Sequence, residues 1–123
     1  MIEFRVDGQP IPQGSMKVIN GHVIHSQGSA LAAWRSAIAL AAKKAGAFPT
    51  RDPITITMAF VFQRPKTVKR LEPTVPPDLD KLVRAVLDAL TAIAYIDDGQ
   101  VIELYAKKMY GLSPGVKIQV ATK

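Results

Sequence analysis

The sequence predicts one α+β domain with a mixed β-sheet and two main helices, in the order β-α-β-α-β-β. The chain has 123 residues, which fits one domain and leaves no room for a second core. Nearly half of the residues are apolar, so an ordinary core can form. Strand-like and helix-like segments follow one another without a repeat, linker or low-complexity stretch. Residues 1 to 123 are therefore expected to form a single domain.

The first half of the chain predicts a strand, an irregular segment and a helix. Residues 2 to 6 alternate apolar and charged side chains, the pattern of a half-buried strand. Glycines and prolines then break regular structure, and residues 17 to 26 are expected to form a loop or an irregular hairpin. A helix is expected over residues 29 to 45, with Gly46 where a C-terminal cap should lie. Its apolar side chains at helical spacing are Leu31, Trp34, Ile38 and Ala41-Ala42.

The second half predicts a helix enclosed by strands. Residues 53 to 62 begin with alternation and end in a continuous apolar run, which predicts a central strand. A second helix is expected over residues 79 to 94, followed by a turn at Asp97-Asp98-Gly99. Residues 101 to 110 and 116 to 122 are expected to form the last two strands. The apolar face of the second helix is formed by Leu79, Leu82, Val83, Val86, Leu87, Leu90 and Ile93.

Composition excludes several classes of protein. The absence of cysteine excludes a disulfide framework and the common cysteine-based zinc sites. Only two histidines occur, His22 and His25, which argues against a metal site built from histidine. The first seven residues carry charges where a signal peptide needs an apolar stretch, and no apolar run reaches the roughly 18 residues that cross a bilayer. We therefore expect a cytoplasmic protein with no membrane partner.

Charge is distributed unevenly along the chain. The net charge is +6, yet residues 78 to 103 hold six acids and two bases, a net of −4. The remainder holds fourteen bases and four acids, a net of +10. A basic body indicates a polyanionic partner, because Lys and Arg neutralise phosphates and release counterions. The plainer interpretation is that the positive charge keeps the protein soluble, but that leaves the concentrated acidic segment unexplained.

The acidic segment has Asp78 and Asp80 at the start of the second predicted helix and two further acids beyond its end. Each has an ordinary structural interpretation. Asp78 is well placed as an N-cap, Asp80 would favour the helix macrodipole, and Asp97-Asp98-Gly99 is a common turn sequence. A helix over residues 79 to 94 spans about 24 Å, so spacing alone does not bring Asp98 to the first two acids. A return segment after the helix, or a site shared across a dimer, would close the gap.

The ordered combination of motifs resembles the RusA family of Holliday junction resolvases. In that family an Asp-x-Asp opens a helix, a basic residue follows four positions later, and an Asp-Asp precedes a Gln-Val strand. The corresponding elements here are Asp78-Leu79-Asp80, Arg84, Asp97-Asp98 and Gln100-Val101, with Leu-Asp-Ala-Leu-Thr at 87–91 in agreement. The resemblance is strongest over residues 77 to 108. It is weaker at the N-terminus, where residues 8 to 12 and Lys17 are similar to the family's opening loop.

The resemblance implies a Mg²⁺-dependent endonuclease that cuts branched DNA. It makes Asp78, Asp80 and Asp98 the metal-binding catalytic carboxylates, with Asp97 as an adjacent, supporting ligand. Magnesium prefers oxygen ligands and is typically held by one or two carboxylates together with waters and substrate phosphate. We expect Mn²⁺ to substitute for it. The metal would activate a water for in-line attack and stabilise the leaving 3′ oxygen, with one or two ions equally compatible with the sequence.

The family usually has Lys where this chain has Arg84. Arginine supplies positive charge through a planar fork, but it cannot donate a proton near neutral pH. Lys81, one turn earlier, can take any role that requires an ammonium group. The simpler interpretation of both residues is solvation of the helix surface. We interpret Asp88 as structural, paired with Arg84 at the i, i+4 spacing.

A basic, proline-punctuated loop precedes the acidic site. Its predicted DNA-binding residues are Arg64, Lys66, Lys69 and Arg70. Contacts of this kind position the DNA backbone without reading its sequence. Lys17 is a further DNA-binding candidate, and Lys107 and Lys108 are secondary ones. Trp34, on a helix rich in alanine, is predicted to be a core or dimer contact and not a base-stacking group.

The resemblance also implies a homodimer, because two identical sites match the need to nick two opposed strands of a four-way junction. The expected setting, again by resemblance, is phage or prophage recombination and replication in a bacterial host cell. One alternative is a non-catalytic DNA-binding protein that uses Asp78 and Asp80 only to cap a helix. Another is a nuclease of the same chemistry that acts on flaps or structured RNA.

Overall fold

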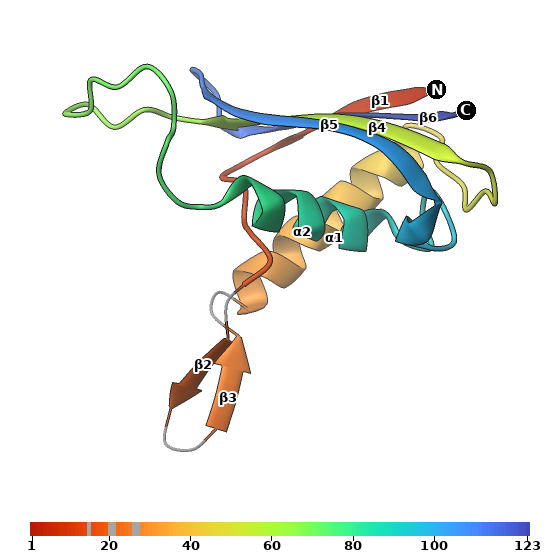
Figure 1. The fold of residues 1–123 in the computed structure, drawn as a ribbon, viewed down its shortest axis with the longest axis horizontal. Helices are drawn as coiled ribbons and strands as arrows, with labels where there is room; N and C mark the ends of the chain where they lie inside the picture. The colour runs from red at the N-terminus through yellow and green to blue at the C-terminus, as the bar shows by residue number, and fades with distance from the viewer. Residues whose placement is uncertain (15, 20–21, 26–27) are drawn as a thin grey trace.

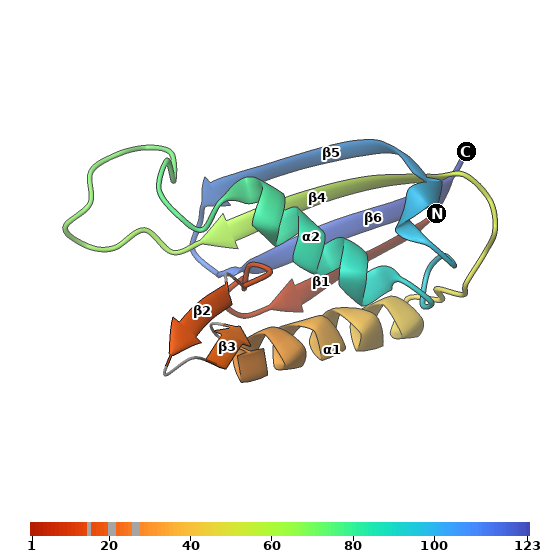
Figure 2. The same ribbon diagram turned by 60° about the horizontal axis from the view of Figure 1, so that its bottom comes forward.

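The computed structural model confirms the predicted α+β domain. It describes residues 1–14, 16–19, 22–25 and 28–123, and it describes no side chain from residue 15 to residue 27. Four strands form a mixed sheet in the order β1-β6-β4-β5, and helices α1 and α2 lie side by side on one face of it (Figures 1 and 2). Across the described ranges, the opposite face carries no helix. None of the helices in those ranges has the length and apolarity that a membrane crossing needs.

The elements follow the predicted order closely. They are β1 (Ile2–Asp7), β2 (Met16–Ile19), β3 (His22–His25), α1 (Gly28–Lys44), β4 (Ile54–Phe62), α2 (Leu79–Leu90), a 3₁₀ helix η1 (Asp98–Gln100), β5 (Val101–Tyr110) and β6 (Gly115–Thr122). The expected irregular hairpin is the antiparallel β2–β3 pair. Gly46 adopts a φ of 102° just after α1, a conformation that favours glycine. The predicted C-terminal boundary of the first helix is therefore confirmed.

Strand β4 organises the sheet. It pairs antiparallel with β6 and parallel with β5, and β1 pairs antiparallel with β6 at one edge. A parallel pair needs a crossover connection, which α2 supplies between β4 and β5. As a consequence, β5 begins at the opposite end of the domain from the start of α2 (Figure 2). This topology determines which of the predicted site residues share an end of the molecule.

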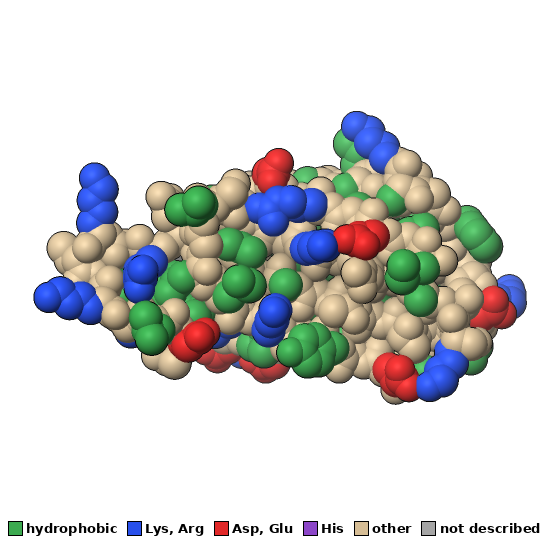
Figure 3. Space-filling view, turned by 90° about the horizontal axis from the view of Figure 1, so that it is seen from above, with side chains coloured by type: hydrophobic (Ala, Val, Ile, Leu, Met, Phe, Trp, Pro, Cys, Tyr) green, Lys and Arg blue, Asp and Glu red, His purple; other side chains and the backbone are tan. Residues whose placement is uncertain are grey.

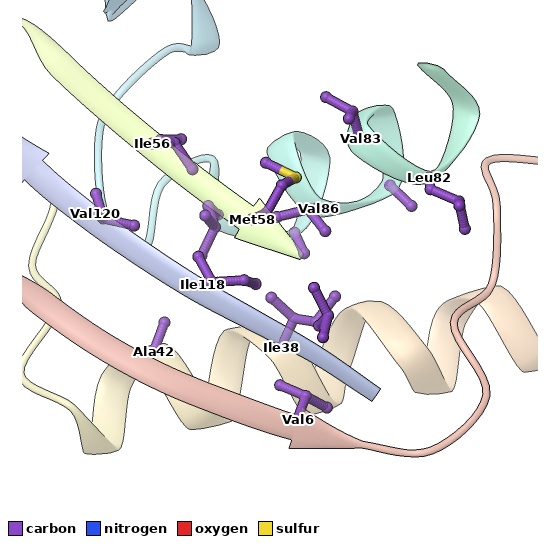
Figure 4. Packing of buried hydrophobic residues seen from close by; sticks show 14 of the residues in the cluster. Val6, Ile38, Ala42, Ile56, Met58, Leu82, Val83, Val86, Ile118 and Val120 are labelled. Carbon is purple, nitrogen blue, oxygen red and sulfur yellow. The ribbon is translucent and has the colours of Figure 1, made fainter. Parts of the chain in front are cut away.

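The core lies between the sheet and the two helices. Alternate residues of β4 are buried on the helix side, and the labelled side chains in Figure 4 fill the space between helices and strands. Trp34 is 6% exposed within a single chain, which confirms it as a core residue. The main buried contributions are Ile54, Ile56, Met58, Phe60 and Phe62 from β4, Leu31, Trp34, Ile38 and Ala42 from α1, and Leu82, Val83, Val86 and Leu90 from α2.

Helix α2 ends at Leu90, and the predicted extension to residue 94 is wrong. Thr91 leaves the helical conformation while its Oγ1 donates a hydrogen bond to Leu87 O at 2.9 Å. Ala92 follows with a φ of 67°, and its N–H donates to Tyr95 O at 2.7 Å. One left-handed residue costs about 1–2 kcal/mol. Burial of the Tyr95 side chain, which the reversal makes possible, offsets that cost.

Tyr95→Phe should lower the free energy of unfolding by about 1 kcal/mol. The Tyr95 side chain is fully buried, and its Oη donates to Leu87 O at 2.7 Å. Burial raises the pKa of this phenol above its ordinary value, so the hydroxyl stays a donor at neutral pH. The loss of unfolding free energy stays modest because Leu87 O also accepts hydrogen bonds from Thr91 N and Oγ1.

Urea denaturation measures this change. Tyr105→Phe is the matched control, because Tyr105 is 61% exposed on the sheet and should change the unfolding free energy by less than about 0.5 kcal/mol. Equal effects of the two substitutions would show that the Tyr95 hydroxyl has no special role in ending α2.

Candidate metal and DNA site

Asp78 and Asp80 lie where the loop after β4 enters α2. Asp78 is the N-cap residue, with φ −69° and ψ 141°, yet its side chain makes no cap hydrogen bond. Both residues are exposed, and neither carboxylate forms an ion pair with another described residue. The positive end of the α2 macrodipole favours negative charge at this place. The helix-cap interpretation therefore does not account for Asp78, whose oxygens are available to a ligand.

Asp97, unlike Asp78, caps a helix with its side chain. It is the N-cap of η1, and its Oδ1 accepts a hydrogen bond from Gly99 N at 2.9 Å. The Gln100 side chain completes the capping box through Oε1, which accepts from Asp97 N at 2.9 Å. Its Nε2 donates to Thr50 O and Asp52 O at 3.0 and 2.9 Å. The Asp97 carboxylate thus serves the turn, and Gln100 fastens that turn to the segment before β4.

Asp98 is exposed at the first position of η1. Helix α2 has 12 residues, about 18 Å, between this end of the domain and Asp78. The return segment after α2 leads to the start of β5 and does not double back toward Asp78 (Figure 2). Among the residues with described side chains, no three acids or histidines are grouped so that they could hold a metal ion. A single chain therefore has Asp78 and Asp80, called the acid pair here, at the start of α2, and leaves Asp97 and Asp98 at the other end.

The basic residues of α2 lie at the Asp78 end. Arg84 is exposed one turn after Asp80, and Lys81 is half-buried in the first turn. The Lys81 carbonyl accepts a hydrogen bond from Gln13 N at 2.9 Å, which holds the opening segment of the chain against α2. The expected Arg84–Asp88 ion pair is absent, although both side chains are described. The Arg84 guanidinium, one turn after Asp80 on α2, is thus not neutralised by Asp88.

The loop of residues 63–77, called the basic loop here, joins β4 to α2 and projects from the same end of the domain (Figure 1). Its predicted DNA contacts are all exposed: Arg64, Lys66, Lys69 and Arg70. Arg70 Nε donates to Tyr110 Oη at 3.0 Å, and the Arg64 guanidinium lies 5.9 Å from the centre of the Tyr110 ring. The basic loop therefore presents cations at the same end of the domain as the acid pair.

Several charges on the helix-free face of the sheet are paired with one another. Lys117 Nζ lies 2.9 Å from Glu3 Oε1, and this hydrogen bond lowers the pKa of the Glu3 carboxyl below its ordinary value. Arg5 Nε donates to Asp7 Oδ1 at 2.9 Å. Acidic and basic side chains accordingly lie next to one another over the middle of this face (Figure 3). The loop end carries several basic side chains together with the exposed acid Glu72. The exposed cations of the basic loop form no ion pair with a described residue and are thus available to a phosphate backbone at the loop end.

The remaining lysine candidates differ in their placement. Lys17 belongs to β2, but its side chain lies outside the described residues. Lys107 is exposed. Lys108 instead donates from Nζ to Val75 O at 2.7 Å and to Pro77 O at 2.8 Å, directly before Asp78. Sequence reasoning grouped Lys108 with DNA contacts and missed this internal role, although strand alternation indicates that neighbouring lysines point to opposite faces.

Comparison with known proteins decides the family. The family model described as "Endodeoxyribonuclease RusA" matches residues 7–121, nearly the whole chain. The chain belongs to this family. A similar protein, "Uncharacterized protein YqaN" of Bacillus subtilis (strain 168), is 28% identical over 134 residues, which cover 97% of this chain and 94% of that protein. Membership in the RusA family confirms the resemblance of the motifs and implies an endonuclease that resolves Holliday junctions.

Proposed function

We propose that this RusA-family protein is a Mg²⁺-dependent homodimer that resolves four-way DNA junctions by paired, symmetric nicks. One observation carries the proposal: in a chain of an endodeoxyribonuclease family, the Asp78 carboxylate stands at a helix N-cap without capping the helix. That argues against a protein that uses Asp78 only as a cap. The setting we propose is recombination and replication of phage or prophage DNA in the bacterial cytoplasm.

Asp78 and Asp80 fit a magnesium ion. They offer exposed carboxylate oxygens that other described charges do not neutralise. Two carboxylates suffice for Mg²⁺ when waters and a substrate phosphate complete the octahedron, and Mn²⁺ accepts the same oxygen ligands. When bound, the ion would lower the pKa of a water for in-line attack and stabilise the leaving 3′ oxygen.

The other residues of this end would hold and orient the DNA. Arg84, one turn from Asp80, would place a planar guanidinium against the scissile phosphate as its charge develops. Lys81 is the adjacent group able to carry an exchangeable proton. The exposed cations of the basic loop would hold the sugar–phosphate backbone of one arm without reading its sequence.

We propose that the second subunit completes the acid set. Strand β5 is an edge strand, since its only sheet neighbour among the described strands is β4. It leaves Ile102 and Leu104 exposed at 56% and 46%. An open edge with apolar side chains favours pairing with another chain.

Antiparallel pairing of two β5 edges about a two-fold axis would bring the start of one strand to the end of the other. Asp98 lies just before the start of β5, whereas Lys108, near its end, contacts Pro77 O beside Asp78. Such a dimer would therefore put the partner subunit's Asp98 at the Asp78–Asp80 end. Each dimer would have two equivalent sites, as two opposed nicks require.

The direct test is cleavage of an end-labelled synthetic four-way junction. We expect paired nicks at symmetric positions in Mg²⁺ or Mn²⁺, no product in EDTA, and no cutting of a linear duplex of the same sequence. Tight junction binding without cleavage in either metal would overturn the nuclease and leave a non-catalytic DNA-binding protein. Preferential cleavage of flap DNA or structured RNA in direct competition would replace the junction as the substrate.

A further inference from the structure

We propose that Lys108 and Tyr110 are positioning residues that fasten the basic loop to the sheet and align it with the acid pair, an inference that rests on the proposed function. The two residues are two positions apart on β5, so their side chains point to the same face of the sheet. Their register partners on β4, Phe60 and Phe62, are buried on the helix side. Lys108 and Tyr110 therefore emerge beneath the basic loop.

The basic loop has little packing of its own. Among its residues only Pro73 is buried. A hollow of about 160 Å³ lies beneath the loop, with Pro65, Pro77, Lys108 and Tyr110 among its lining residues. A loop without a packed core beneath it stays ordered only through other contacts.

Two sets of hydrogen bonds, one from Lys108 and one to Tyr110, supply those contacts. In the part of the chain that the structure describes, every side-chain hydrogen bond between the basic loop and the rest of the molecule involves Lys108 or Tyr110. Lys108 Nζ donates to Val75 O and Pro77 O at 2.7 and 2.8 Å, and Tyr110 Oη accepts from Arg70 Nε at 3.0 Å. These hydrogen bonds have a charged donor, which makes them stronger than neutral ones.

The hydrogen bonds of Lys108 and of Tyr110 act on different parts of the proposed site. Lys108 holds the backbone immediately before Asp78, so it sets where the acid pair stands relative to the sheet. Tyr110 holds Arg70, lies under the guanidinium of Arg64, and so orients the arginines. Arg64 Nη1 also donates to Arg70 O at 3.2 Å, which joins both arginines and Tyr110 into one unit. Lys108 should therefore govern metal use and turnover, and Tyr110 should govern DNA affinity.

The test for Lys108 separates turnover from binding in the full-length protein. Lys108→Met should lower the cleavage rate at saturating junction about 10-fold and raise the Mg²⁺ concentration for half-maximal rate by a similar factor. The junction Kd, measured without metal, should stay within about 2-fold. Lys108→Arg, which keeps the charged donor, should recover most of the rate. Lys117→Met removes the same charge from an exposed lysine on the helix-free face and should not shift the Mg²⁺ dependence.

For Tyr110 we expect the opposite result: DNA affinity changes and the Mg²⁺ dependence does not. Tyr110→Phe removes the hydroxyl acceptor and keeps the ring, and it should weaken junction binding about 3-fold. Tyr110→Leu, which also removes the ring under Arg64, should weaken binding about 10-fold. Neither should change the Mg²⁺ concentration for half-maximal rate. Tyr105→Phe, at an exposed tyrosine of the same strand, should change neither quantity.

Limited trypsin digestion gives a readout that does not depend on activity. Cleavage after Lys66, Lys69 or Arg70 should accelerate in Lys108→Met and Tyr110→Leu at a temperature well below the Tm of each variant. Wild-type digestion rates in both variants, or a Lys108→Met protein with wild-type rate and Mg²⁺ dependence, would overturn the inference. Parallel losses of binding and turnover in both variants would also overturn it, because they would indicate a general loss of structure. If the wild-type protein cuts no DNA, the proposed function fails, and digestion still decides whether the two residues hold the loop.

Discussion

Asp80→Asn should lower the rate of junction cleavage by roughly 10³-fold, about 4 kcal/mol at 1.36 kcal/mol per factor of ten. Asparagine keeps the size of the side chain but removes the charge that would hold a divalent cation against the scissile phosphate. Asp80 is exposed and forms no ion pair with another described residue, so the substitution should leave the unfolding free energy within about 0.5 kcal/mol. Single-turnover cleavage of a labelled junction in Mg²⁺ measures the effect.

Asp88→Asn is the matched control for Asp80→Asn. Asp88 lies on the same helix, two turns further along and half-buried, and should keep a cleavage rate close to wild type. Junction binding in the absence of metal should be retained or strengthened in Asp80→Asn, since one negative charge near the phosphates is removed. A near-wild-type rate for Asp80→Asn would show that the acid pair is not the metal site. Equal losses in both variants would attribute the effect to the charge of the helix as a whole.

Heterodimers of Asp80→Asn with Asp98→Asn should recover about half of the wild-type nicking rate, although each homodimer is inactive. If each site takes Asp78 and Asp80 from one subunit and Asp98 from the other, one site of the heterodimer carries both substitutions and the second carries neither. The intact site nicks one strand. This follows from the place of Asp98 at the opposite end of α2 from Asp78.

Co-expression with two different affinity tags and purification on both would isolate the heterodimer. A denaturing gel should then show single nicks in place of paired ones, at positions that the wild-type protein also cuts. A dimer of two Asp80→Asn subunits that carry the two different tags, prepared in the same way, is the control and should stay inactive. No activity in the mixed heterodimer would mean that Asp98 completes a site within its own subunit. A wild-type rate in the Asp98→Asn homodimer would mean that Asp98 takes no part in the reaction.

The strands and the first helix followed from local pattern. Residues 2 to 6, 53 to 62 and 101 to 110 are strands because alternation or apolar runs of that length bury one face of an extended chain. The first helix ends next to Gly46 because glycine readily takes the positive φ needed there. The family signature is local too: the spacing of Asp78, Asp80 and Arg84 along one helix can be read without a structure.

Contacts between residues far apart in the sequence determined where α2 ends and where Asp98 lies. Apolar spacing continues to Ile93, yet α2 stops at Leu90, because burying Tyr95 stabilises the reversal more than another turn of helix would. The parallel pairing of β4 with β5 places Asp98 away from Asp78, and no feature within either segment specifies that pairing.

The role of each polar side chain also depended on its surroundings. Asp78 and Asp97 both precede helices, but only Asp97 caps one, because its carboxylate reaches a backbone N–H and that of Asp78 does not. Lys107 and Lys108 are neighbours in the chain, yet Lys108 alone meets the carbonyls of the basic loop. Local sequence selects the conformation of a segment, whereas the partner of a charged group is selected by which segments the buried core brings together.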